Sequence, residues 1–168
     1  MKTYQIIGIT VGAFVAGTIV TLSILNPRNY AETSVNADDF NLRTRRYTIS
    51  KKSFSGDDDA GAIRSVVKEI GFILARQKTY GRSWQVVDSA IEKKSAAIKA
   101  TVPVVIFTDD LQVAVEFESA KNGDSTKMQI VVNVRSTSRV GNSDLGENRR
   151  HIVQLLEDLD FSFGNENF

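Results

Sequence analysis

The chain has 168 residues, of which 42% are hydrophobic and 24% charged, a composition typical of one folded domain with a short appendage. Its net charge is only +1, so no field from the whole protein draws it onto nucleic acid. It contains no cysteine and one histidine, His151, which excludes disulfides, thiol chemistry, iron–sulfur clusters and multi-histidine metal sites within one chain, and we expect no cofactor.

An apolar segment near the N-terminus is the first predicted element. Residues 6–25 carry no charge, and a helix of that length, rising about 1.5 Å per residue, spans the hydrocarbon core of a bilayer. Pro27 favours a helix end just beyond this run, because proline lacks an N–H and fixes φ. We therefore predict a single-pass transmembrane anchor within residues 1–29.

A cleaved signal peptide is the alternative, and it would make the product an exported soluble protein of unknown activity. Lys2 gives the charged start of such a signal, and Ala31 lies near a plausible cleavage point. The apolar run is longer than the roughly 7–15 residues of a usual signal core. Asn29 is also a poor match for the small residue expected before the cleavage point, so we favour a retained anchor.

Within the apolar run, Gly8, Gly12 and Ala16 share one helix face. Small residues at this spacing let a second membrane helix approach closely, although glycine and alanine are also common in membrane helices generally. Lys2 and Arg28 flank the run almost evenly. The short N-terminal tail therefore decides the orientation that we expect, with the folded domain on the periplasmic or lumenal side of the membrane.

Residues 30–56 are polar and are predicted to be a linker with a short edge strand near residues 46–50. Basic residues gather in its second half, where they would suit either a solvated linker or a contact with anionic headgroups. Three consecutive aspartates, at 57–59, predict the start of a helix, because carboxylates there accept free N–H groups and oppose the positive end of the dipole.

The next part of the chain predicts a helix followed by strands. Apolar residues at three- and four-residue spacing indicate an amphipathic helix over residues 59–77, packed on a sheet. A strand is expected around residues 84–87. Residues 96–101 and 103–107 are expected to form one strand interrupted at Pro103, or two short strands on either side of it.

Two runs of alternating apolar and polar residues, at 111–117 and 128–134, flank a strong turn signal and predict an antiparallel hairpin. A second apolar helical stripe covers residues 144–159. The tail over residues 161–168 is expected to fray, although Phe161 and Phe163 could dock on the domain. Helices segregated from hairpin-linked strands indicate an α+β domain over residues 57–160, with an antiparallel sheet and two packed amphipathic helices.

The segment that joins the last strand to the last helix is rich in hydrogen-bond donors and glycine. Its guanidinium groups, hydroxyls and free helix N–H groups would suit a phosphate, sulfate or carboxylate. They would suit a structural network as well, with Arg135 and Arg139 paired to Asp109 and Asp110, and both interpretations stay open. The candidate residues are Asp109, Asp110, Arg135, Ser136, Ser138, Arg139, Gly141, Asp144, Gly146, Asn148 and Arg149.

The same segment, RSTSRVGNSDLGENRRHI, resembles the signature of the domain-of-unknown-function 1499 family, which runs approximately R-S-x-S-R-x-G-x-x-D-x-G-x-N-R-x-R-I. Phe107 to Asp110 resembles the F-x-D-D element of that family, while His151 stands where the family usually has arginine. The resemblance covers roughly residues 57–159. It implies a compact domain, often membrane-associated or exported and without an established reaction, and its plastid and cyanobacterial members suggest a photosynthetic membrane such as the thylakoid.

The sequence contains no nucleophile elbow, glycine-rich phosphate loop or dinucleotide fingerprint. A Ser–His–Asp set could be drawn from Ser138, His151 and Asp144, but a histidine on a helix is more often a surface residue. We therefore expect a non-enzymatic, membrane-anchored accessory or assembly subunit of a larger membrane complex. The alternative partner is a small anion or lipid headgroup, bound at the loop over residues 135–149.

Overall fold

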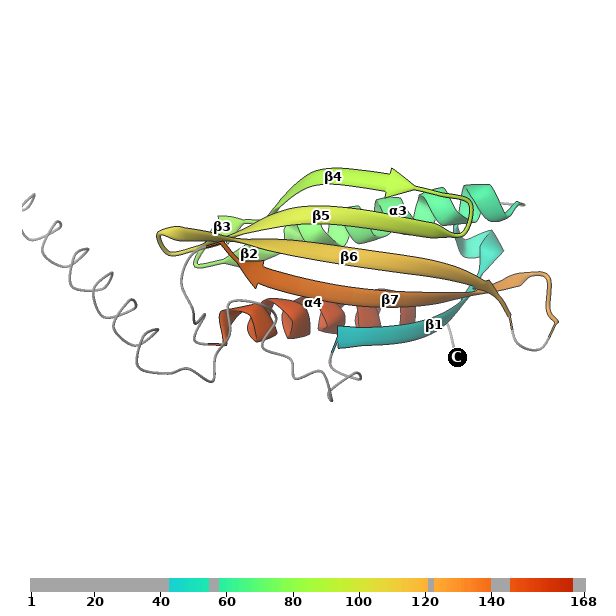
Figure 1. Ribbon diagram of the computed structural model, residues 1–168. Coiled ribbons are helices and arrows are strands. Elements are labelled where there is room, and N and C mark those ends of the chain that lie inside the picture. Colours follow the sequence, from blue (N-terminus) through green and yellow to red (C-terminus); the bar gives the residue numbers. More distant parts are fainter. Residues whose placement is uncertain (1–42, 55–57, 121–122, 140–145, 165–168) are drawn as a thin grey trace, which may run out of the picture.

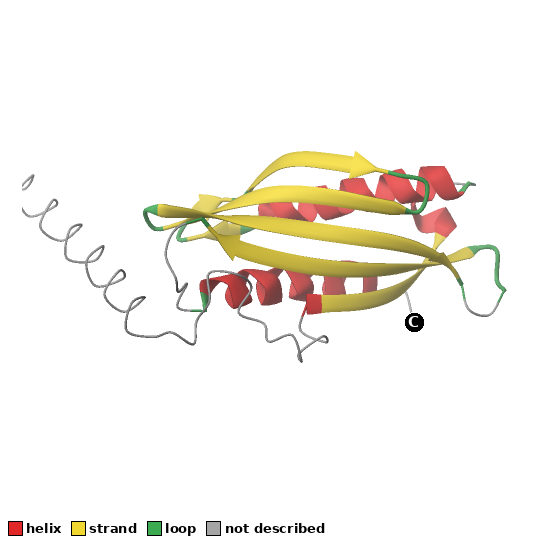
Figure 2. Cartoon of the chain, in the orientation of Figure 1, coloured by secondary structure: helices red, strands yellow, loops and turns green. Residues whose placement is uncertain are grey.

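A five-stranded antiparallel sheet with two helices packed on one face makes up the described part of the chain (Figures 1 and 2). The computed structural model describes residues 43–54, 58–120, 123–139 and 146–164. The elements are β1 (Thr44–Ser50), the 3-10 helix η1 (Lys51–Phe54), α3 (Asp59–Arg76), β2 (Lys78–Thr79), β3 (Arg82–Ser83), β4 (Gln85–Ile91), β5 (Ser95–Val104), β6 (Phe107–Ser119), β7 (Lys127–Ser138) and α4 (Glu147–Gly164).

The sheet has the order β1-β7-β6-β5-β4, and β2 and β3 form a separate two-stranded hairpin. Alternation along the long strands places one set of side chains towards the helices: in β6, Leu111, Val113 and Val115 are each at most 1% exposed. The apolar stripes of α3 and α4 complete a single core. The α+β prediction, with an antiparallel sheet and two packed amphipathic helices, is confirmed.

Several boundaries fall where they were predicted. The edge strand is present as β1, two residues longer than expected, and the hairpin of alternating runs is β6–β7, with Val115 opposite Val132. Asp58 caps α3 by accepting a 2.7 Å hydrogen bond from the Gly61 N–H.

Three predicted boundaries are wrong. Trp84 lies between β3 and β4, 2% exposed, so the predicted strand starts one residue later. Strand β5 runs unbroken through Pro103, its penultimate residue, where the sheet is about to end and proline is tolerated. The chain then turns at Val105 (φ +41°) and Ile106, so residues 103–107 are not one strand.

The last helix begins and ends later than predicted. Gly146 has φ +86°, which no helix residue adopts, and its carbonyl accepts the first helical hydrogen bond, from the Arg150 N–H at 3.0 Å. Helix α4 therefore starts at Glu147 instead of residue 144. It continues to Gly164 because Phe163 is fully buried against Tyr47 and Phe54, so the predicted fraying of residues 161–164 is wrong.

No helix among the described residues is long and apolar enough to cross a membrane. The predicted anchor within residues 1–29, with Gly8, Gly12 and Ala16, and the linker as far as residue 42 lie outside the described residues.

Candidate functional site

The described residues of the predicted loop site lie at one end of the domain, where β6 begins, β7 ends and α4 starts (Figure 1). Asp109 lies opposite Ser138 in the sheet, and Asp110 lies opposite Thr137. Because neighbouring strand residues point to opposite faces, Asp109 faces the helices and is 2% exposed, while Asp110 lies on the outer face. The two aspartates therefore cannot act as one carboxylate pair.

Arg139, directly after β7, pairs with Asp110 on the outer surface. Its Nε lies 3.0 Å from both carboxylate oxygens, and Nη2 lies 2.6 Å from Oδ1. The hydrogen bonds and the negative charge of Asp110 raise the pKa of the guanidinium above its ordinary value. About half of each side chain is exposed, so solvent screens the pair and it contributes little to stability. The pairing of Arg139 with an aspartate, one of the interpretations left open for this loop, is thus present, but at the surface.

Asn148 connects the first turn of α4 to the end of β7. It is fully buried, accepts a 2.6 Å hydrogen bond from the Ser136 hydroxyl, and donates a 3.1 Å bond to the Ser138 hydroxyl oxygen. Since Ser136 and Ser138 are two apart, both hydroxyls face the helix. Three polar residues of the family-like signature therefore hold α4 against the sheet.

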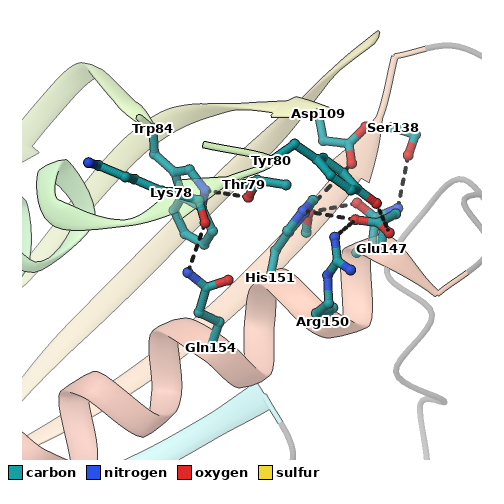
Figure 3. A network of polar contacts seen from close by, with 12 residues as sticks. Lys78, Thr79, Tyr80, Trp84, Asp109, Ser138, Glu147, Arg150, His151 and Gln154 are labelled. Carbon is teal, nitrogen blue, oxygen red and sulfur yellow. Dashed lines mark hydrogen bonds and ion pairs between the residues drawn. The ribbon is translucent and has the colours of Figure 1, made fainter. Parts of the chain in front are cut away.

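His151 is fully buried one turn beyond Glu147, at the centre of the polar network in Figure 3. Its Nδ1 lies 3.6 Å from Asp109 Oδ2 and its Nε2 lies 3.5 Å from Glu147 Oε2, distances longer than ordinary hydrogen bonds. The ring meets Trp84 edge-on, with 5.6 Å between ring centroids. The expectation that His151 is a surface residue is wrong.

A sequence signal for this burial exists. His151 stands four residues before Leu155, and Asn148 stands four residues before Ile152, so both continue the apolar stripe of α4 towards its N-terminus. Polar residues on such a stripe are buried with it, and they then need polar neighbours from the sheet.

Glu147 joins the network to the β2–β3 hairpin. It accepts a 2.8 Å hydrogen bond from the Tyr80 hydroxyl and a hydrogen bond from Arg150, whose guanidinium also lies 5.1 Å from the centre of the Tyr80 ring. Tyr80 (φ +51°) and Gly81 (φ +76°) form the two-residue turn of this hairpin. These contacts fix the hairpin on α4, and no pattern in the sequence predicted them.

A second set of hydrogen bonds anchors the same hairpin further along α4. The Trp84 indole N–H donates a 2.7 Å bond to the Thr79 hydroxyl oxygen (Figure 3). The Gln154 amide donates to the Gln77 side-chain oxygen at 2.7 Å and to the Lys78 carbonyl at 3.3 Å. Trp84 therefore belongs to the hydrophobic core and also contacts the polar network through Thr79 and His151.

The predicted anion-binding residues are divided between the two sides of the sheet. Arg135 is exposed on the outer face opposite Gln112, while Ser136 and Ser138 face the helices. Arg149 is exposed on α4, and Gly141 and Asp144 lie outside the described residues. The described donors thus do not converge on one point, and anion binding at this loop stays a prediction.

The described members of the Ser138, His151 and Asp144 set have other neighbours. The Ser138 hydroxyl oxygen accepts a hydrogen bond from Asn148, and His151 lies near two carboxylates and an indole ring. Asp144 lies outside the described residues. In the part of the chain that the structure describes, no three residues among His, Asp and Glu are placed to hold a metal ion. The network serves to join β6, β7, the β2–β3 hairpin and α4.

Acid should weaken this junction through Glu147. Burial raises the pKa of the Glu147 carboxyl, but the His151 contact, the Tyr80 hydrogen bond and the Arg150 charge together outweigh it, so the pKa lies below its ordinary value. A carboxylate with a depressed folded-state pKa stabilises the fold above its unfolded pKa of about 4.3, and this contribution is lost as the pH falls through the folded value.

We therefore expect Glu147→Gln to be less stable than the parent at neutral pH and to lose less stability on acidification, measured by urea unfolding across the acid range. Glu157→Gln, on an exposed position of the same helix, should follow the parent curve. If the free energy of unfolding fell equally with pH in the parent and in Glu147→Gln, the depressed pKa assigned to Glu147 would be contradicted.

Comparison with known proteins agrees with the resemblance seen in the sequence. A family model described as "Protein of unknown function (DUF1499)" matches residues 23–159. The matched range contains every described element from β1 to the greater part of α4. No curated protein matches the chain.

Proposed function

The chain belongs to the DUF1499 family of proteins of unknown function, and we propose that it is a membrane-anchored, non-enzymatic accessory subunit of a larger membrane complex. Its folded domain would dock on a partner protein through strand β4. This open edge strand is the observation that carries the proposal.

Strand β4 forms one edge of the sheet, and all seven of its residues are exposed. Three are large aliphatic residues: Val86 is 40% exposed, Val87 58% and Ile91 45%. An edge strand presents unpaired N–H and C=O groups to any strand or loop that approaches it, and apolar side chains beside them add to the attraction. This surface suits a protein partner.

The pairing of β4 with β5 shifts register between Val86 and Asp88. A bulge of this kind twists the edge and discourages sheet-to-sheet pairing between identical copies. Asp88 also forms a 3.6 Å ion pair with Lys99 of β5, which leaves charge beside the aliphatic residues. These features favour a specific partner over self-association.

The non-enzymatic part of the proposal rests on the signature residues. Asn148 bonds to Ser136 and Ser138, and Arg139 pairs with Asp110. Asn148 holds α4 on the sheet through the two serines, and Arg139 and Asp110 offset each other's charge on the outer face, so these contacts are structural. The membrane part rests on the uncharged run at residues 6–25.

The anchor predicts firm attachment to the membrane. Carbonate washing should leave the full chain in the membrane fraction, because about twenty apolar residues hold a helix in the bilayer far more strongly than headgroup contacts hold a peripheral protein. N-terminal sequencing of the retained protein should begin at Met1. A soluble product that begins near Glu32 would establish a cleaved signal instead.

Docking through β4 predicts a specific sensitivity to charge. Membranes solubilised in mild detergent should yield the chain co-migrating with a larger complex on native gels, and Val87→Glu should release it, because a carboxylate at the contact would be desolvated without a partner. Phe161→Glu is the matched control, since Phe161 is also exposed and lies on α4. Equal release by both variants would contradict docking at β4.

A further inference from the structure

A cavity of about 440 Å³ lies at the end of the domain opposite the His151 network. The β4–β5 turn, the β6–β7 turn, η1 and the first turn of α3 surround it, at the end of the sheet towards which β6 runs (Figure 1). Its size is within the range of small-molecule sites, which are usually apolar with a few polar groups.

The floor of the cavity is apolar. Ile63 of α3, Phe117 of β6 and Met128 of β7 line it, and each belongs to the hydrophobic core, with only 4–5% of its surface exposed. The hydrophobic core therefore reaches the wall of the cavity. A hydrocarbon chain placed against these side chains would extend the core.

The acidic groups of the lining are already engaged. Asp59 pairs with Lys51 at 2.6 Å, and Glu118 pairs with Arg46 at 3.7 Å. Asp124 accepts hydrogen bonds from the Thr126 hydroxyl at 2.6 Å and the Thr126 N–H at 2.9 Å. Lysine or arginine therefore offsets the charges of Asp59 and Glu118, while Asp124 stays ionised and the nearby Lys127 and Lys51 partly offset its charge.

Three lysines of the lining have a different environment. Lys93, Lys94 and Lys127 are exposed at the rim, and among the described residues none of them forms an ion pair. Ammonium groups on flexible stems can close over an anionic group held at the opening. Positive charge at the rim and apolar surface at the floor are the two halves of a site for an amphiphile.

We propose that this cavity binds an anionic amphiphile, with its carboxylate or phosphate at Lys93, Lys94 and Lys127 and its acyl chain against Ile63, Phe117 and Met128. The ligand could be a free fatty acid or an anionic membrane lipid, which share this chemistry. The site lies beside the β4–β5 turn, at the end of the domain opposite the His151 network, and the proposal does not depend on the accessory role.

The test uses the full chain in phosphatidylcholine nanodiscs, with thermal unfolding followed by the fluorescence of Trp84, the only tryptophan. Decanoate should raise the unfolding midpoint in a saturable way, as expected for a ligand that binds only the folded state. Decanol and inorganic phosphate, which each supply one half of the chemistry, should not. Nanodiscs that contain phosphatidylglycerol test the lipid source: a raised midpoint without decanoate identifies a membrane lipid as a ligand.

Variants separate this site from general charge effects. The triple variant Lys93→Gln/Lys94→Gln/Lys127→Gln should weaken decanoate binding at least tenfold. The control Lys68→Gln/Lys78→Gln/Lys99→Gln removes the same charge from exposed lysines outside the cavity lining and should bind like the parent. Ala60→Phe, at an exposed lining residue, should block the cavity while preserving the far-ultraviolet circular dichroism spectrum.

Equal weakening by both triple variants, an equal response to decanol, or no response to either decanoate or phosphatidylglycerol would overturn the proposal. Co-migration with a complex tests the accessory role separately. A negative result for amphiphile binding therefore does not contradict the accessory role, and the reverse is also true.

Discussion

Replacing Val115 by aspartate should unfold the domain. Val115 is fully buried at the centre of the sheet, between Ala96 of β5 and Val132 of β7. A carboxylate there would lose its hydration without gaining a partner, which costs several kcal/mol even after the group protonates. Since a typical domain is stable by about 5–15 kcal/mol, this substitution would remove much or all of the stability.

Ala114→Asp is the control, because Ala114 is adjacent in β6 but exposed on the outer face. It should change the urea midpoint only slightly, while Val115→Asp should abolish the cooperative unfolding transition. Similar transitions for the two variants would show that the faces of β6 are assigned in the wrong phase.

Replacing Phe163 by alanine should cost about 3–5 kcal/mol of unfolding free energy, the usual range for a fully buried phenylalanine. Phe163 is completely buried in the last turn of α4, with its ring centroid 5.5 Å from that of Tyr47 and 5.7 Å from that of Phe54. Its removal would leave a cavity where α4, β1 and η1 meet, and the neighbouring aromatic rings could fill it only in part.

Phe161→Ala, two residues earlier in the same helix, provides the comparison. Phe161 is 77% exposed, so its removal should change the unfolding free energy by no more than about 0.5 kcal/mol. Urea unfolding at constant m-value measures both. Equal costs for the two phenylalanines would contradict the docking of the C-terminal turn.

The sheet could be predicted from sequence because β6 and β7 are half-buried and long enough for alternation to be unmistakable. The pattern in Val113, Val115 and Phe117 assigns a face to each residue, and the turn near Gly123 (φ +72°) joins the two strands. Strand β4 gave a weaker signal because neither of its faces is buried, so its composition follows no period.

The sequence predicted several residues of the candidate site but not how they are arranged. Asp109, Ser136, Ser138 and Asn148 do meet at one end of the domain, but the sequence could not show that Arg139 and the serines lie on opposite faces. It also missed Tyr80, Trp84 and Glu147. These residues reach the network through a two-stranded hairpin whose position depends on tertiary packing and not on a local pattern.

The end of α4 shows a similar limit. Phe163 and Phe161 lie in the same polar tail, and hydrophobicity alone does not distinguish them. Phe163 lies four residues beyond Leu159, which itself lies four residues beyond Leu155, so it continues the buried stripe of the helix. Phe161 does not share this spacing. The ion pair and hydrogen bond from Arg45 and Tyr47 to Asp160 then fix this turn on β1.

Photo-crosslinking from strand β4 in intact membranes tests the accessory role most directly. With a photoreactive amino acid in place of Val87, irradiation should yield an adduct of the full chain with one membrane-protein partner, because the exposed edge is where that partner is proposed to dock. The same amino acid in place of Phe161, exposed on α4, should yield no such adduct. A chain that remains free of adducts at position 87, or that labels equally at both positions, would contradict the account.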